Sequence, residues 1–252
     1  MLSKKGYILH LFIKPEHKLI MKEVKEFSLI KGHGIEGDIN ANPISPRQVL
    51  VVRYEDISEL GIPPGELREN IVIAGIQPVN FTPGSLISFD NGAAIRLTFH
   101  CEPCKQIAHL VDSLKILQAK RGILGVVINS GKICIRDNLQ IEIDKFPALS
   151  ENPYERFLDF ILKVPAGKVV TYQQIIQGIG VDNSYLRAIP IYLKKTSADD
   201  YPIHRILDSK GYLIKYVDNQ LHKLESEGIK ILSNSNLSNS KNGFFVDYLK
   251  YL

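Results

Sequence analysis

The chain has 252 residues, of which 44% are hydrophobic, and its formal net charge is +4. This length and composition allow one large domain or two smaller ones, and without a run of about 18 apolar residues we expect no membrane-spanning helix. The net charge, of which two units fall on either side of Pro147, is too small for purely electrostatic nucleic-acid binding. Three cysteines do not make a disulfide framework. We expect a cytoplasmic protein with no membrane partner.

Up to Lys145, short apolar segments alternate with Gly, Pro and Asn. The segments are rich in Ile, Val and Leu, as β-strands are. The predicted strands are Tyr7–Ile13, Gln48–Val52, Asn70–Ile73, Ser85–Phe89, Ile95–Phe99, Leu124–Ile128, Ile133–Arg136 and Leu139–Ile143. Helices are predicted only at Glu55–Leu60 and Lys105–Lys120. Many short strands at close spacing indicate a β-barrel or a β-sandwich.

Helical patterns dominate the rest of the chain. Asn152, followed by proline, predicts the start of a first helix. Thr171 and Gln174 form a capping-box pattern ahead of a second short helix. Ser184 can cap a third helix over Tyr185–Lys194. The second and third helices, joined by a short glycine-containing turn, indicate a helix-turn-helix with the third as recognition helix.

The change of pattern predicts an α+β protein of two domains. Residues 145–150 are a plausible linker between a first domain at 1–146 and a second domain at 151–252. Asn234–Asn242 is polar throughout most of its length, and we expect a loop there.

Five motifs of the second domain occur in a consistent order. They are Val164–Tyr172, Arg187–Ile189, Pro202–Arg205, Ser209–Gly211 and Leu224–Gly228. Together they resemble the DNA-binding domain of the alkylguanine-DNA alkyltransferases, over residues 152–228, and imply a winged helix-turn-helix. In that family the cysteine of a Pro-Cys-His-Arg motif accepts the alkyl group. Ile203 stands at the cysteine position here, and because isoleucine has no nucleophilic atom, alkyl transfer cannot occur there.

The resemblance also implies DNA-contacting residues, which are Tyr172, Arg187, Ile203, His204, Arg205, Tyr216 and Glu227. His204 matches the family's base and Glu227 the acid that orients it. Arg187 matches the arginine that fills the gap left by a flipped nucleotide. The two tyrosines match those near the 3′ phosphate and the base pocket.

A subclass, the alkyltransferase-like proteins, carries Trp in place of the cysteine. Its members bind alkylated guanine and flag it for other repair systems, so the resemblance implies DNA containing alkylated guanine and nucleotide excision repair proteins as partners. Two positions depart from the family. Pro190 replaces a glycine inside the recognition helix, which could bend it, and Thr196 replaces the usual hinge asparagine.

The first domain contains a second ordered set of motifs. They are Gly34–Asp38, Arg47–Val52, Pro64–Ile71, Pro83–Ile87, Glu102–Cys104 and Arg121–Val127. The set resembles a MOSC domain, the β-rich module named after molybdenum-cofactor sulfurases. The resemblance implies that Cys104 carries sulfur or binds the molybdenum of a pterin cofactor, and that Asp38, Arg68 and Asn70 belong to the cofactor pocket. Free-standing relatives reduce N-hydroxylated nucleobases, which requires a reductase as electron donor.

Other interpretations are open. Cys101 and Cys104 form a C-x-x-C pattern, which is typical of a redox pair or of part of a zinc site, with His100 and His109 as further ligands. The whole chain is either a two-domain protein that acts on damaged nucleobases or a non-enzymatic DNA-damage binder with an inactive MOSC scaffold. Without the family pattern, the second domain would be a purely structural one.

Overall fold

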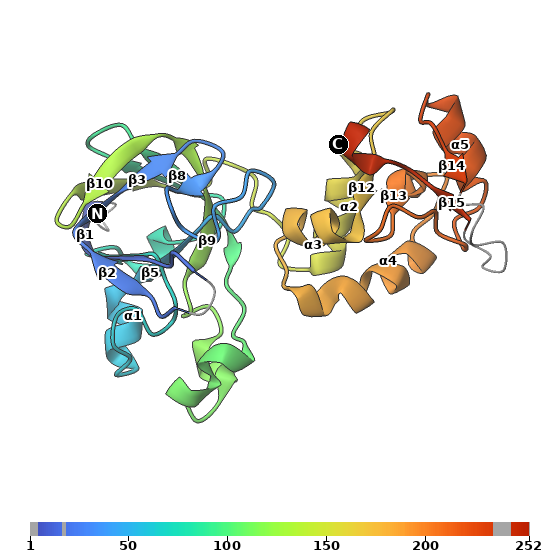
Figure 1. The fold of residues 1–252 in the computed structure, drawn as a ribbon. Helices are drawn as coiled ribbons and strands as arrows, with labels where there is room; N and C mark the ends of the chain where they lie inside the picture. Colours follow the sequence, from blue (N-terminus) through green and yellow to red (C-terminus); the bar gives the residue numbers. More distant parts are fainter. Residues whose placement is uncertain (1–4, 17–18, 234–242, 252) are drawn as a thin grey trace. The chain divides into compact units, whose positions relative to one another are not determined.

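The computed structural model describes residues 5–16, 19–233 and 243–251, and it divides into two compact units (Figure 1). Unit 1 is Met1–Glu151 and unit 2 is Asn152–Leu252. Within the described ranges, no helix is long and apolar enough to span a bilayer. The predicted loop at Asn234–Asn242 lies outside the described residues.

Unit 1 is built around a closed barrel of seven strands. The barrel strands are β1 (Lys5–Ile13), β5 (Val49–Arg53), β6 (Ile71–Ala74), β7 (Leu86–Phe89), β8 (Ala94–His100), β9 (Ile123–Asn129) and β11 (Asn138–Glu142). Their order is β11-β7-β8-β9-β5-β6-β1, and β1 closes the ring by pairing with β11. Within the barrel, β5 and β6 pair in parallel and all other neighbouring strands pair antiparallel. This architecture confirms the predicted β-rich first domain.

Three short strands that the sequence did not indicate complete the unit. β2 (Lys22–Val24) pairs with β1. β3 (Glu26–Ile30) lies between β4 (Gly34–Ile35) and β10 (Gly131–Cys134) in a separate sheet. β2 and β4 are too short to give an alternating pattern, whereas β3 does alternate polar and apolar residues from Glu26 to Leu29 and was missed.

Barrel strand β5 is apolar at nearly every position because both of its faces are buried. Val49 and Val51 belong to the cluster to which all seven barrel strands contribute. Leu50 and Val52 point to the opposite face and pack in a second cluster. Helix α1 (Tyr54–Glu59) contributes Ile57 to that second cluster. An unbroken apolar run is the pattern expected of a strand covered on both sides.

The helix predicted over Lys105–Lys120 is wrong. The segment forms two separate 3₁₀ helices, η2 (Lys105–Leu110) and η3 (Leu114–Leu117). Val111 between them is extended, and the Ser113 side chain accepts a hydrogen bond from the Lys115 amide and so starts the second turn. Serine competes with a continuous helix in this way because its hydroxyl satisfies a backbone amide locally.

Unit 2 is a small α+β domain. Its helices are α2 (Pro153–Leu162), α3 (Tyr172–Gly178), η4 (Asn183–Arg187), α4 (Ile189–Lys195), η5 (Ile203–Arg205), α5 (Gln220–Ser226) and η7 (Tyr248–Lys250). The predicted caps at Asn152 and Thr171 are confirmed, the second with both hydrogen bonds of a capping box. Phe157 of α2, Ile175 of α3 and Ile203 of η5 share one buried core.

The third predicted helix, Tyr185–Lys194 with Ser184 as cap, is corrected by the structure. Asp182 is the cap, because its carboxylate accepts the Ser184 amide at 2.7 Å, and the helix is divided into η4 and α4. Pro190 explains the division. Proline has no amide hydrogen to donate within a helix, so a new helix begins with Pro190 in its first turn.

Two pairs of short strands complete unit 2. β12 (Val170–Thr171) and β13 (Ile206–Leu207) pair in parallel. β14 (Leu232–Ser233) and β15 (Phe244–Phe245) pair antiparallel. The chain end folds back onto the unit, because the Val169 amide donates to the Tyr251 carbonyl at 3.1 Å and the Val246 amide to the Gly211 carbonyl at 2.9 Å.

Candidate functional site

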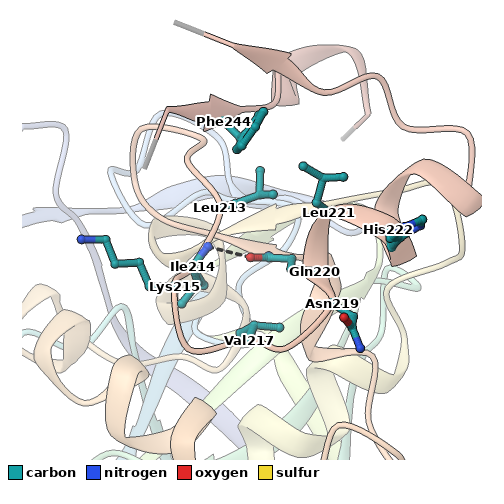
Figure 2. A pocket seen from close by; sticks show the side chains of 9 residues that line it. All are labelled: Leu213, Ile214, Lys215, Val217, Asn219, Gln220, Leu221, His222 and Phe244. Carbon is teal, nitrogen blue, oxygen red and sulfur yellow. Dashed lines mark hydrogen bonds between the residues drawn. The ribbon is translucent and has the colours of Figure 1, made fainter. Parts of the chain in front are cut away.

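A pocket of about 330 Å³ lies where the loop before α5 meets the start of that helix and β15 (Figure 2). Its lining residues are Leu213, Ile214, Lys215, Val217, Asn219, Gln220, Leu221, His222 and Phe244. None of the residues predicted to contact DNA lines this pocket. Three of the predicted DNA residues, His204, Arg205 and Glu227, meet instead at the end of α5.

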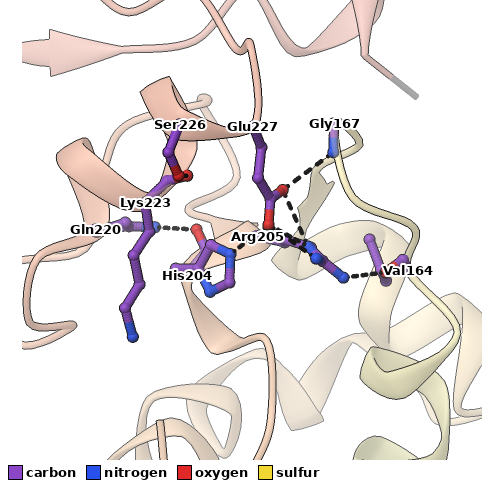
Figure 3. A network of polar contacts seen from close by, with 8 residues as sticks. All are labelled: Val164, Gly167, His204, Arg205, Gln220, Lys223, Ser226 and Glu227. Atoms are coloured by element: carbon purple, nitrogen blue, oxygen red, sulfur yellow. Dashed lines mark hydrogen bonds and ion pairs between the residues drawn. The ribbon is translucent and has the colours of Figure 1, made fainter. Parts of the chain in front are cut away.

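Glu227, which ends α5, is the centre of a polar network (Figure 3). Its Oε1 accepts hydrogen bonds from His204 Nε2 at 2.8 Å and from Arg205 Nη2 at 2.8 Å. Its Oε2 accepts the Gly167 amide at 3.0 Å and Arg205 Nε at 3.1 Å. Burial alone would raise the pKa of Glu227, but the hydrogen bonds from Arg205, His204 and Gly167 outweigh it and lower the pKa from 4.5 to about 2. The carboxylate is therefore ionised at neutral pH.

The ionised carboxylate fixes the tautomer of His204. Because a carboxylate only accepts hydrogen bonds, Nε2 of His204 carries the hydrogen. Nδ1 is then left with a lone pair in the neutral ring, and it is buried without a partner among the described residues. His204 and Glu227, predicted as base and orienting acid, are brought together by the fold.

Arg205 has a structural position in the same network. Besides its bonds to Glu227, its Nη1 donates to the Val164 carbonyl at 2.6 Å. It thereby joins the turn after α2 to the end of α5, and its DNA contact stays a prediction.

Tyr172 and Tyr216 form a second contact between distant segments. Tyr172 begins α3 and Tyr216 lies in the loop before α5, and their hydroxyl oxygens are 3.2 Å apart. Burial, together with the hydrogen bond to Tyr216, raises the pKa of Tyr172, so its hydroxyl stays protonated. The Lys194 ammonium of α4 lies 5.2 Å from the centre of the Tyr216 ring. The contact connects the recognition helix to this loop.

Arg187 and Ile203 occupy opposite environments. Arg187 ends η4 and is exposed, and its side chain joins no contact with the hydrogen-bonded cluster around Glu227. Ile203 is only 5% exposed and packs in the apolar core of unit 2. An apolar, buried side chain thus occupies the position beside His204.

In unit 1, Asp38 and Asn70 form a buried pair. Asn70 Nδ2 donates to Asp38 Oδ2 at 3.1 Å, and the same oxygen accepts the Lys14 amide at 2.9 Å. Asp38 Oδ1 accepts the amide and the side chain of Asn40. The side-chain oxygen of Asn70, Oδ1, accepts a hydrogen bond from the Leu50 amide at 3.0 Å. These bonds use most of the pairing capacity of both side chains inside the protein.

Lys14 interacts electrostatically with both Asp38 and Arg68. Burial, followed by the positive charge of Arg68, lowers the pKa of Lys14, while Asp38 acts in the opposite direction. Arg68 has a left-handed backbone, with φ of 65°. Lys14 was not among the residues predicted for this site, and its only signal is its place directly after the apolar first strand.

The two cysteines of the C-x-x-C pattern differ in accessibility. Cys101 is 2% exposed, and burial raises the pKa of its thiol despite the nearby charges of Arg121 and Arg47. Cys104 is half-buried at the start of η2. Both thiols are free. Among the described residues, no hydrogen bond joins Cys104 to Asp38, Arg68 or Asn70.

Arg121 is a buried cation that contacts this segment and has an unused donor. It is 6% exposed, its Nη1 donates to the Glu102 carbonyl, and its Nε has no hydrogen-bond partner in the described part of the chain. His100, an alternative zinc ligand, pairs through Nδ1 with Glu151 at 2.8 Å. No group of three or more His, Cys, Asp or Glu side chains in the described ranges is arranged to hold a metal ion.

Comparison with known proteins assigns each unit to a domain type. Residues 152–229 match the family model described as 6-O-methylguanine DNA methyltransferase, DNA binding domain. Residues 45–140 match the MOSC domain model. Alkyltransferase-like protein 1 of Schizosaccharomyces pombe is 31% identical over 88 residues, which are 32% of this chain and 81% of that protein.

Solved structures are similar to parts of the chain. One is S. pombe Atl1 in complex with damaged DNA containing O6-carboxymethylguanine, which is 26% identical, covers 41% of this chain and 95% of that chain, and has a TM-score of 0.35. The YUAD protein of Bacillus subtilis is 21% identical, with 54% of this chain and 95% of that chain covered and a TM-score of 0.48.

Proposed function

The chain belongs to the alkyltransferase-like family, with a MOSC domain before the DNA-binding domain, and we propose that unit 2 binds alkylated guanine in DNA by base flipping without alkyl transfer. The observation that carries this proposal is Ile203, which stands at the acceptor position while His204 and Glu227 beside it keep their hydrogen bond. The pair of His204 and Glu227 is thus kept, while the nucleophile is absent.

The proposed binding follows from the positions of the remaining side chains. Extruding a base from the stack costs a few kcal/mol, and a side chain that fills the gap offsets part of this cost. Arg187 is exposed and available for that role. Tyr172 and Tyr216 offer aromatic rings and hydroxyls to the flipped base and its phosphate. Nucleotide excision repair proteins would then act on the marked lesion.

The test is an incubation with duplex DNA that carries a labelled alkyl group on guanine. We expect reversible, salt-sensitive binding that is tighter than to the undamaged duplex, and an unchanged protein mass. All three cysteines precede residue 152, so label recovered on a peptide of unit 2 would disprove the proposal. Equal affinity for both duplexes would also disprove it.

For unit 1 we propose that Cys104 carries sulfur or binds the molybdenum of a pterin cofactor, and that the domain reduces N-hydroxylated bases with electrons from a reductase. The charge of Arg121 suits an anionic group, because this side chain is buried and its Nε is unpaired. Arg121 also binds the Glu102 carbonyl, two residues before Cys104. Thiolate is a soft ligand that suits molybdenum or persulfide. When bound, the cofactor would supply two-electron redox chemistry.

A scaffold role for unit 1 is the second candidate. The observation that favours it is the internal pairing of Asp38 and Asn70, which leaves few of their polar atoms for a ligand. Metal analysis of protein produced in cells that make molybdopterin distinguishes the two candidates. Bound molybdenum or a persulfide on Cys104 favours the enzyme, and the absence of both favours the scaffold.

A further inference from the structure

Gln220, the first residue of α5, makes three hydrogen bonds through its side chain. Its side chain is buried, at 4% exposure. The carbonyl oxygen accepts the Ile214 amide at 2.6 Å (Figure 2). The amide nitrogen donates to the His204 carbonyl at 3.0 Å, drawn in Figure 3, and to the Ile206 carbonyl at 2.7 Å. All three partners are backbone atoms.

These contacts join the two segments that form the proposed base site. One segment contains Ile203 and His204, and the other is the loop that carries Tyr216 two residues after Ile214. Because Glu227 at the opposite end of α5 holds the imidazole of His204, the helix fixes the His204 turn at two points. Gln220 adds the loop to the same helix.

Ile214 and Val217, on either side of Tyr216, are buried in the core of unit 2, whereas Tyr216 itself has few contacts. Tyr216 is 40% exposed and contacts the rest of the unit through the Tyr172 hydroxyl and the Lys194 ammonium. Both contacts are weak relative to a buried, fully hydrogen-bonded amide. Apolar packing of Ile214 and Val217 holds the loop in the core but does not direct it, and Gln220 adds the directional hydrogen bonds that join the Ile214 backbone to the His204 backbone.

We propose that Gln220 is a positioning residue that fixes the Tyr216 loop against the His204 turn and thereby sets the preference for alkylated over undamaged guanine. The inference rests on the proposed base binding. Glutamine is suited to the position because it supplies one acceptor and two donors on a side chain long enough to reach both segments. Glutamate lacks the donors, asparagine is one methylene shorter, and methionine has a similar shape without the hydrogen bonds.

The experiment measures Kd of the full chain for a duplex with one central O6-methylguanine and for the same duplex undamaged. The variants are Gln220→Met and Gln220→Asn. We expect the ratio of the two Kd values to fall about tenfold in Gln220→Met, the scale of lost buried hydrogen bonds, while binding to undamaged DNA changes little. Hydrogen exchange of residues 211–217 should become faster in the same variant.

Two controls separate positioning from general destabilisation. Gln177→Met makes the same chemical change on α3, and Ile176→Val removes a methyl group from the core of unit 2. Neither control should change the ratio, even where Ile176→Val lowers the melting temperature as much as Gln220→Met does. An unchanged ratio in folded Gln220→Met, or an equal loss in Ile176→Val, would overturn the inference. A wild-type protein without preference for the damaged duplex would instead overturn the proposed function and this inference with it.

Discussion

The hydroxyl of Tyr172 lies 3.2 Å from the hydroxyl of Tyr216, so the start of α3 and the loop before α5 are joined by two side chains that the sequence separates by 44 residues. A base that enters between them has to exchange this bond for bonds of its own. The pair therefore gives a direct test of where the base is bound.

Tyr172→Phe should weaken binding to alkylated DNA by about 0.5–1.5 kcal/mol, because it removes one hydroxyl hydrogen bond. Fluorescence anisotropy with a labelled duplex would measure the change. Tyr212→Phe, in the same loop as Tyr216, is the matched control and should bind as wild type does. Equal affinities in wild type and Tyr172→Phe would place the DNA phosphate elsewhere.

Arg187→Ala should cost roughly 1–3 kcal/mol of binding to damaged DNA, the scale of a stacking contact with a base. Lys163→Ala, at the exposed C-cap of α2, removes the same charge at a position not predicted to contact DNA and serves as control. Both titrations should be run at several salt concentrations. If the two variants lose the same affinity, Arg187 acts only through its charge.

Ile203→Cys should introduce alkyl transfer, because it places a thiol beside His204, whose Nδ1 is buried and unpaired. Intact-mass measurement after incubation with O6-methylguanine DNA would detect one added methyl group. Ile203→Ser, with a far less acidic group, is the control and should stay unmodified. A Cys variant that binds the lesion but gains no methyl group would show that the base is held in a different position.

Lowering the pH should destabilise unit 2 through Glu227. The folded state holds the pKa of this carboxyl at about 2, below its ordinary value of 4.5, so its stabilising effect is complete above pH 4.5 and is lost as the pH falls toward 2. The effect amounts to roughly 3 kcal/mol. Chemical denaturation between about pH 6 and about pH 2.5 would measure the free energy of unfolding. This free energy should fall more steeply in wild type than in Glu227→Gln. Parallel curves would contradict the assignment.

Cys104→Ser should abolish retention of molybdenum or persulfide sulfur, because an alcohol is a harder and far less acidic ligand than a thiol. Cys101→Ser should have a smaller effect, since Cys101 is buried and its thiol pKa is raised. Elemental analysis and persulfide labelling would measure both. Equal loss in the two variants together with bound zinc would favour the C-x-x-C metal site.

The sequence predicted what depends on nearby residues. The helix caps at Asn152 and Thr171 could be predicted because each cap residue lies within a few residues of the amide from which it accepts a hydrogen bond. The barrel strands were readable from their β-branched runs. The division of the predicted Lys105–Lys120 helix depended on the competing Ser113 cap, which a hydrophobic pattern does not reveal.

Contacts across long distances in sequence could not be predicted. The bond between Asp38 and Asn70 spans 32 residues, and only the closed barrel brings the two side chains together. Gln220 has backbone partners only, so no residue type in the chain points to its role. The pairing of His204 with Glu227 was expected solely because the family motifs implied it.

The hydrogen bond from the Val169 amide to the Tyr251 carbonyl has a consequence for protein synthesis. During translation, Val169 leaves the ribosome long before Tyr251, so the backbone around β12 completes this pairing only after most of unit 2 has been synthesised. Unit 1 has all of its barrel strands by Glu142 and can close earlier. The two units should therefore mature in sequence, with the second waiting for the last residues of the described chain.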